Sequence, residues 1–207
     1  MKFAKDGIPT ITFLLLAAAA FAFVSAVPAA VTAVLAGLVL WFYRDPDRAV
    51  PEGEGLFTSP ADGRVVEIAE AEHPFTGPAV KVGIFMNVFS VHVNRAPCMG
   101  RVDYLEYVPG RKIAAFAPKA SEVNERNLVG LSTPYGPVLM VQIAGLLARR
   151  IVYRLRRNNL RSFLFAFKFN FFSFYKLLAA DKFGYLIFLI IDKAGVANDA
   201  NEPDQIG

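Results

Sequence analysis

Residues 8–43 read IPTITFLLLAAAAFAFVSAVPAAVTAVLAGLVLWFY, a run of apolar and small residues that contains no charged side chain. One membrane crossing needs about 20 apolar residues, so the run is too long for a single simple span and slightly short for two full ones. Pro28 lies near its middle, and we expect it to divide the run into two short helices that form a hairpin. A single tilted span with an extension along the membrane surface is the other interpretation, and a cleaved signal peptide is disfavoured because its apolar region is shorter.

Aromatic and basic residues flank the apolar run. Residues 41–43 (WFY) end it, at the place where an aromatic belt at the membrane–water interface is expected. Basic residues lie just outside both ends of the run: Lys2, Lys5, Arg44 and Arg48. Because positively charged flanks favour the cytoplasmic side, a hairpin would leave both of its ends there. We therefore predict a membrane anchor over residues 1–43, on the cytoplasmic face of the cell membrane.

The composition is typical of a small membrane-associated protein. A chain of 207 residues has room for one modest domain beside a membrane segment. Its 55% hydrophobic content and mean hydropathy of +0.39 exceed what a soluble domain usually needs. The net charge of +4 lies in short basic clusters, which suits anionic membrane lipids as partners, and no nucleic-acid-binding motif accompanies it. The sequence leaves open whether the chain forms a homo-oligomer.

Cysteine and histidine are too scarce for a disulfide or a metal cluster. Cys98 is the single cysteine, so no disulfide can form within the chain. His73 and His92 are the two histidines, and neither belongs to a recognisable set of zinc ligands. We predict no metal.

The segment after the anchor has first the composition of a linker and then that of short strands. Residues 44–55 (RDPDRAVPEGEG) are charged and rich in Pro and Gly, as linkers are. Short runs rich in Val, Ile, Tyr and Phe follow between turn signals: GRVVEIAE (63–70), AVKVGIFM (79–86), RVDYLEYV (101–108) and VLMVQIAG (138–145). Tyr135-Gly136-Pro137 predicts a hairpin turn. Residues 56–157 therefore predict a mainly β fold, a β-sandwich or partly closed barrel of short strands behind an N-terminal transmembrane helical hairpin.

Residues 158–207 differ in kind from the rest of the chain. The preceding residues favour Ala, Gly, Val, Pro and Arg, whereas this Phe-rich tail favours Phe, Lys, Asn, Leu and Ile. Several phenylalanines fall on every second position, which is the period of a strand: Phe163, Phe165, Phe167, Phe169 and Phe171. An irregular aromatic segment that lies on the membrane is the alternative. We treat the tail as a separate, divergent segment.

Five short motifs between residues 42 and 152 follow the apolar anchor: FYRDPDR, SPADGRVVEI, IFMNVFSVHVNRAPCMGRV, NERN and VQIAGLLARRIV. In this order they resemble the short archaeal and bacterial form of phosphatidylserine decarboxylase, a pyruvoyl-dependent carboxy-lyase. The resemblance implies conversion of phosphatidylserine to phosphatidylethanolamine and CO₂ in phospholipid biosynthesis. It also implies a zymogen, in which a serine hydroxyl attacks the carbonyl of the preceding residue, usually glycine, and leaves a pyruvoyl group as cofactor. The ketone of that group then forms a Schiff base with the substrate amine.

The resemblance assigns catalytic roles to Asp62 and His92. Asp62, in SPADG, matches an acidic residue that supports an activating histidine, although Asp-Gly after Pro is also an ordinary turn. His92, in FSVHVNR, matches the first histidine of the family's histidine element, and Arg95 stands where some relatives carry a second one. A lone histidine in an apolar strand is also typical of a satisfied core residue.

Arg95, Asn124 and Arg126 are the candidate substrate-binding residues. Arginine can hold a lipid phosphate or carboxylate by paired hydrogen bonds. A solvated loop with surface ion pairs is the alternative interpretation of these residues.

The cleavage pair of the family has no counterpart in the chain. In relatives a Gly-Ser pair follows a segment that resembles RFGLIRFGSR, whereas here residues 181–188 (DKFGYLIF) are followed by Leu189 and Ile190, and no Gly-Ser dipeptide occurs. Neither side chain has a hydroxyl that could attack a carbonyl, so no pyruvoyl-forming serine is found. We expect a member of the family that lacks the conversion step. A shifted reading frame, fusion or assembly fault from about residue 154, an inactive relative, and cleavage at an unfamiliar site remain open explanations.

A non-catalytic, membrane-tethered β-module is the alternative function. The motif PADGRVV is similar to strand starts of lipoyl- and biotin-carrier sandwiches, which hold their cofactor on a lysine in a tight hairpin. The comparable Asp192-Lys193-Ala194 lies in the Phe-rich tail and not in the β domain. An adaptor that binds anionic lipid without chemistry belongs to the same class.

Overall fold

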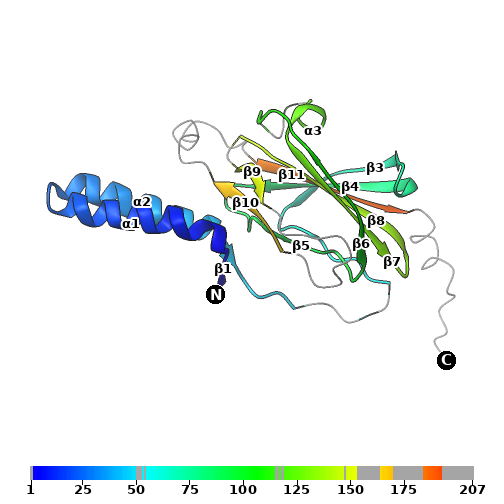
Figure 1. The fold of residues 1–207 in the computed structure, drawn as a ribbon, viewed down its shortest axis with the longest axis horizontal. Helices are drawn as coiled ribbons and strands as arrows, with labels where there is room; N and C mark the ends of the chain where they lie inside the picture. Colours follow the sequence, from blue (N-terminus) through cyan, green and yellow to red (C-terminus); the bar gives the residue numbers. More distant parts are fainter. Residues whose placement is uncertain are drawn as a thin grey trace.

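Two helices project from one end of a β domain in the computed structural model of the chain (Figure 1). The structure describes residues 2–49, 53, 55–114, 117, 119–146, 148–152, 164–169 and 184–192. The order of elements begins with a short strand β1 (Lys2–Phe3), a 3-10 turn η1 (Lys5–Gly7) and the two helices.

The predicted helical hairpin is confirmed. Helix α1 (Ile8–Ala22) and helix α2 (Ala26–Phe42) pack against each other along their length. The chain turns before Pro28, at Ser25, whose backbone is extended. Pro28 itself lies in the first turn of α2, where its missing N–H leaves no helical hydrogen bond unmade. The run is therefore divided near its middle as predicted, with the break at residues 23–25, and Pro28 is the third residue of the second helix.

Backbone pairing closes the base of the hairpin. Strand β1 pairs with β2 (Arg44–Asp45), the Ala4 amide donates to the Tyr43 carbonyl at 2.9 Å, and Lys2 pairs with Asp47 at 2.6 Å. A Cβ atom on Gly7 would lie 2.5 Å from the Tyr43 ring, so only glycine allows this close approach. The two charged ends of the apolar run are thereby held together on one side.

Six antiparallel strands form the main sheet, in the order β3-β4-β11-β8-β7-β6. Their bounds are β3 (Arg64–His73), β4 (Gly77–Asn87), β6 (Arg101–Val108), β7 (Arg126–Thr133), β8 (Gly136–Ile143) and β11 (Gly184–Asp192). Each of the four strand-like runs that the sequence predicts coincides with one of these strands. The predicted hairpin turn joins β7 to β8.

A smaller sheet of three strands lies beside the main sheet, in the order β5-β10-β9. Its strands are β5 (Val93–Arg95), β10 (Leu164–Phe169) and β9 (Ala148–Val152), and one short helix, α3 (Ala120–Val123), precedes β7. The mainly β prediction is confirmed, and the sheets formed by the described residues are open and do not close into a barrel. Strand β10 lies within the segment where the sequence predicts a strand, while Phe163 and Phe171 lie outside the described residues.

Strand β11, orange in Figure 1, brings part of the Phe-rich tail into the middle of the main sheet. It pairs with β4 from Gly184 to Asp192 and with β8 on its other side. Phe188, Leu189 and Ile190 are buried, as a central strand covered on both faces requires. The apolar run GYLIFLIID therefore supplies a core strand.

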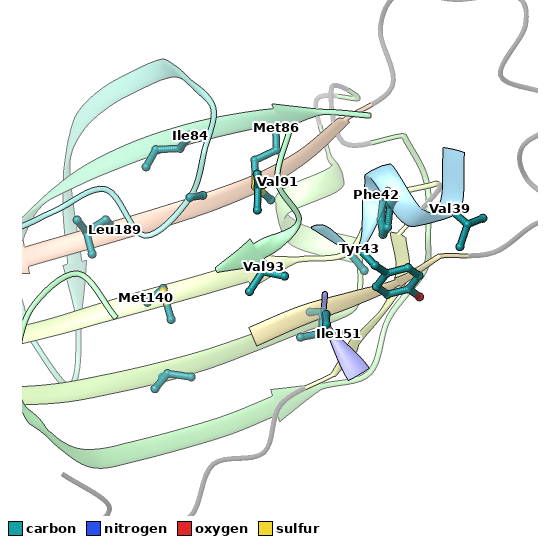
Figure 2. Packing of buried hydrophobic residues seen from close by; sticks show 14 of the residues in the cluster. Val39, Phe42, Tyr43, Ile84, Met86, Val91, Val93, Met140, Ile151 and Leu189 are labelled. Carbon is teal, nitrogen blue, oxygen red and sulfur yellow. The ribbon is translucent and has the colours of Figure 1, made fainter. Parts of the chain in front are cut away.

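One apolar cluster joins the base of the hairpin to the β domain (Figure 2). It includes Val39, Phe42 and Tyr43 from the hairpin base with Val91 and Val93 beside β5. Phe42 and Tyr43 are 2% and 1% exposed, whereas Trp41 is 50% exposed. The prediction that all three aromatic residues line a membrane interface is therefore wrong for Phe42 and Tyr43, because the β domain packs directly on the end of α2.

Candidate active site

His92 lies buried between β4 and β5, directly under the end of the hairpin. Its side chain is 1% exposed and its ring stacks on Phe42, with 3.9 Å between ring centroids and 19° between the planes. Burial lowers the pKa of His92 to about 3; a hydrogen bond with the Ser90 backbone opposes this shift, and the nearby positive charge of Arg44 adds to it. The imidazole is therefore neutral at pH 7, and its burial opposes protonation.

Three buried amide side chains connect the small sheet to the main sheet. Gln142 of β8 donates to Asn94 of β5 at 3.0 Å, and Asn127 of β7 donates to Gln142 at 3.2 Å. Asn94 in turn contacts the Met86 sulfur at 3.5 Å. The Asn127 side-chain oxygen has no hydrogen-bond partner among the described residues. Asn94 and Gln142 were not among the predicted site residues, although a polar residue inside an apolar strand, as in VHVNR and VQI, was the available signal.

Arg95 is already engaged by a carboxylate of the same chain. Its guanidinium forms an ion pair with Asp45 and donates to the Pro46 carbonyl at 2.7 Å. The Asp45 side chain is only 14% exposed, so the pair is partly shielded from water. In this conformation Arg95 fastens the segment after α2 to β5.

Asp62 lies nearer the surface than His92. Its carboxylate, 40% exposed, forms an ion pair with Arg48, in the turn where Ser59 donates to the Ala61 carbonyl at 2.7 Å. Arg44 links the two candidate catalytic residues electrostatically, since its charge acts on His92 and is itself influenced by Asp62. The two predicted catalytic residues thus belong to one region at the base of the hairpin but to different environments.

Asn124 and Arg126 bind backbone groups of the chain itself. Asn124, 1% exposed, donates to the carbonyls of Ile113 and Ala144 at 2.9 and 2.8 Å and accepts from the Ile113 amide at 3.0 Å. Arg126 donates to the carbonyls of Ser121 and Glu122 in α3, at 2.8 and 2.7 Å. Both side chains therefore order the loop before β7.

Glu125, between them, is a buried carboxylate that sequence reasoning did not single out. It is 2% exposed, accepts a hydrogen bond from the Ile151 amide at 3.1 Å and pairs with Lys112 at 3.2 Å. These contacts join the start of β7 to β9 of the small sheet. Within the described ranges no three His, Cys, Asp or Glu side chains lie close enough to hold a metal ion.

Leu189 and Ile190 stand in β11 where the resemblance would place a Gly-Ser pair. Leu189 belongs to the cluster that contains Val91 and Val93, and Ile190 belongs to a second cluster on the opposite face of the sheet. Both side chains are hydrocarbon and buried, so these residues do not fit the formation of a pyruvoyl group. Ser162 and Ser173 lie outside the described residues.

Comparison with known proteins gives consistent matches. A family model described as phosphatidylserine decarboxylase matches residues 35–186, which end just before Leu189. A phosphatidylserine decarboxylase proenzyme of Symbiobacterium thermophilum is 49% identical over 152 residues, covering 72% of this chain and 71% of the relative. Proenzymes of Carboxydothermus hydrogenoformans and Syntrophus aciditrophicus are 51% and 52% identical, covering 55% and 58% of this chain and 54% and 57% of their own lengths.

Proposed function

This chain belongs to the phosphatidylserine decarboxylase family, and from that membership we propose that it is a membrane-anchored relative that binds phosphatidylserine but does not convert itself into the active lyase. The family is one of carboxy-lyases, and its matched relatives are named as proenzymes. Ancestry of this kind accounts for the motifs around Asp62 and His92.

The observation that carries the proposal is the chemistry of Leu189 and Ile190 in the central strand. Self-cleavage needs a hydroxyl that attacks the preceding carbonyl, and a ketone is then needed to accept the electrons left when CO₂ departs. Two buried hydrocarbon side chains supply neither group. We infer that the chain remains in one piece and releases no CO₂ from phosphatidylserine.

Of the explanations for the Phe-rich tail, we favour an inactive relative. The family match runs to residue 186, and β11 pairs along its whole length with β4, so the tail contributes a fitting strand. A shifted reading frame from about residue 154 would have no reason to produce such a strand. The genomic DNA around codon 155 tests this choice, since a second frame that encodes Phe-Gly-Ser-Arg would overturn it.

The substrate-binding role of Arg95, Asn124 and Arg126 is part of the same proposal. Arg95 would exchange the Asp45 carboxylate for a lipid phosphate or carboxylate, because a guanidinium binds all three groups by similar paired hydrogen bonds. Asn124 and Arg126 would then act through the loop before β7, whose backbone they hold. His92 and Asp62 keep the catalytic roles that the resemblance implies, His92 as the activating histidine and Asp62 in support of it.

We propose that the hairpin enters the cell membrane from its cytoplasmic face. Residues Lys5–Ala22, which comprise η1 and α1, form one stretch of 18 residues that is long and apolar enough to cross a membrane. Helix α2, with 17 residues, is longer than α1 and one residue shorter than this stretch. At 1.5 Å per residue α1 and α2 measure about 22 and 26 Å, less than the roughly 30 Å of the hydrocarbon core. Because β1 and β2 hold both ends together, the hairpin would enter and leave on one side.

The test is to reconstitute the full chain in vesicles that contain carboxyl-labelled phosphatidylserine. We expect one band, an intact mass of 22.7 kDa and no labelled CO₂. The Symbiobacterium thermophilum proenzyme, treated identically, is the positive control. Two fragments, with a pyruvoyl group at the start of one, would overturn the proposal.

A membrane-tethered module that binds anionic lipid without chemistry is the alternative. The internal engagement of Arg95, Asn124 and Arg126 favours it, since all three already serve the fold. Binding to phosphatidylserine vesicles that survives both Asp62→Ala and His92→Ala would support this alternative. The carrier version depends on Lys193, which lies outside the described residues.

A further inference from the structure

The loop between β4 and β5 presents Phe89 to the outside on a well-ordered turn. Phe89 is 65% exposed. The Asn87 side-chain oxygen accepts the amides of Phe89 and Ser90 at 2.9 and 3.1 Å, and the Ser90 hydroxyl accepts the Asn87 amide at 3.2 Å. The turn is therefore fixed by its own hydrogen bonds while its apolar side chain remains uncovered.

Arg44 fastens this loop to the end of helix α2. Its guanidinium donates to the Phe89 carbonyl at 2.6 Å and to the Trp41 carbonyl at 2.8 Å, and it lies 4.1 Å from the centre of the Trp41 ring. One arginine thus binds the backbone carbonyls of two exposed aromatic residues, one from the hairpin and one from the β domain.

Trp41 also ends the uncovered apolar surface of the hairpin. More than half of the exposed large apolar side chains in the described part of the chain lie on or between the two helices, from Ile8 to Trp41. A patch of this size marks a surface that contacts a membrane or another protein. Phe89 continues that surface onto the β domain.

We propose that Phe89, Trp41 and Arg44 form a second membrane contact, an interfacial platform that seats the His92 end of the β domain on the phospholipid headgroup layer. The inference rests on the proposed insertion of the hairpin. Two exposed aromatic residues that one guanidinium joins match that layer, where aromatic rings lie among the headgroups and arginine meets phosphate. Continuity with the apolar hairpin selects a lipid surface over a protein partner.

The platform has a consequence for how a lipid would reach the site. His92 follows Phe89 in the same loop and stacks on Phe42, the neighbour of Trp41. A headgroup beside the platform would therefore lie next to the candidate active site.

A single tryptophan in the chain makes the contact measurable. In a Trp41→Phe background, one variant carries Phe89→Trp, a second carries Phe23→Trp at the hairpin turn, and a third carries Met99→Trp as control. Met99 is 90% exposed. The next residue, Gly100, lies close to Ser132 and Thr133 at the β7–β8 turn. This turn is at the end of the main sheet that is remote from the helices in Figure 1. Each variant is reconstituted in phosphatidylcholine–phosphatidylglycerol vesicles with and without brominated acyl chains.

We expect brominated lipid to quench the emission of the Phe23→Trp and Phe89→Trp variants, with a blue shift for both, and to leave the Met99→Trp variant unchanged. Quenching at position 23 without quenching at position 89 would overturn the platform while leaving the inserted hairpin intact. Absence of quenching at position 23 would overturn the proposed membrane attachment, and the platform with it. Equal quenching at positions 89 and 99 would also reject a defined contact.

Discussion

His92 shows at the scale of one residue how burial decides chemistry. The ring lies under Phe42, away from water, and this desolvation lowers its pKa to about 3 from an ordinary 6.5. Such a histidine stays neutral through the physiological range. The same burial makes the protonated ring costly, which links this residue to the stability of the fold.

The free energy of unfolding should therefore decrease on acidification because of His92. In the unfolded chain the histidine takes up a proton with a pKa near 6.5, whereas in the folded chain it does so only near pH 3. Stability that is present above pH 6.5 is therefore lost progressively as the pH falls from 6.5 towards 3. Between pH 7 and pH 5 the loss should be about 2 kcal/mol. Denaturant unfolding in detergent at both pH values measures it.

His92→Phe should reduce this pH dependence, and His73→Gln is the matched control for removing a histidine elsewhere. An equal loss of stability on acidification in wild type and His92→Phe would contradict the assigned cause.

Phe42 and Trp41 are adjacent in sequence but differ in the energy that each contributes. Phe42 is buried against His92 and Tyr43, whereas Trp41 is half exposed. Phe42→Ala should lower the free energy of unfolding by about 3–5 kcal/mol, the usual range for a buried phenylalanine. Trp41→Ala should cost less than about 1 kcal/mol. Similar small losses for both variants in detergent would show that Phe42 is not part of the core.

At the scale of elements, β11 is the piece on which the main sheet depends. Its two neighbours, β4 and β8, do not pair with each other, so removal of β11 leaves two long edges and two apolar clusters uncovered. Unpaired apolar edges promote aggregation. A strand from the compositionally divergent tail thus holds the two halves of the sheet together.

Truncation of the tail tests this role. A chain that ends at residue 157 should aggregate or lose cooperative unfolding, because it lacks β11. A chain that ends at residue 192 keeps β11 and should unfold with a midpoint close to that of the full chain. Circular dichroism and size-exclusion chromatography in detergent distinguish the two variants, and a folded, monodisperse 1–157 chain would contradict the central position of β11.

At the scale of the whole molecule, the hairpin and the β domain share one core. The cluster that begins with Ile11 and Leu14 in α1 continues through Val39, Phe42 and Tyr43 to Val91 and Val93. The ion pair of Arg95 with Asp45 fastens the same junction from outside. The anchor therefore sets the orientation of the β domain through packing and does not act as a loose tether.

Deletion of residues 1–43 should consequently damage the β domain even without a membrane. Removal of Phe42 and Tyr43 uncovers Val91, Val93 and His92, so the shortened chain should precipitate or bind a hydrophobic dye strongly. The control keeps the full length and carries Phe13→Ser and Leu16→Ser, both at exposed hairpin positions, and its β domain should remain folded. A stable, soluble 44–207 chain would show that the domain does not need the anchor.

The sequence alone determined the local and covalent features of this protein. The uncharged run of residues 8–43 predicts a hairpin, the alternating runs predict strands, and the motifs around Asp62 and His92 predict the family. The absence of a Gly-Ser dipeptide is likewise evident from the sequence. Each of these features depends on neighbouring residues or on the identity of a side chain.

Only the tertiary structure decided which distant residues meet. It put Phe42 in the core and Trp41 outside, inserted β11 between β4 and β8, and joined Asn94 to Gln142. Alternating apolar residues predict that one face of a strand will be buried. They do not predict which other strand or helix will cover that face, because the covering element depends on the packing of the whole chain. For the same reason the pairing of Arg95 with Asp45, which occupies a predicted substrate contact, could not be foreseen.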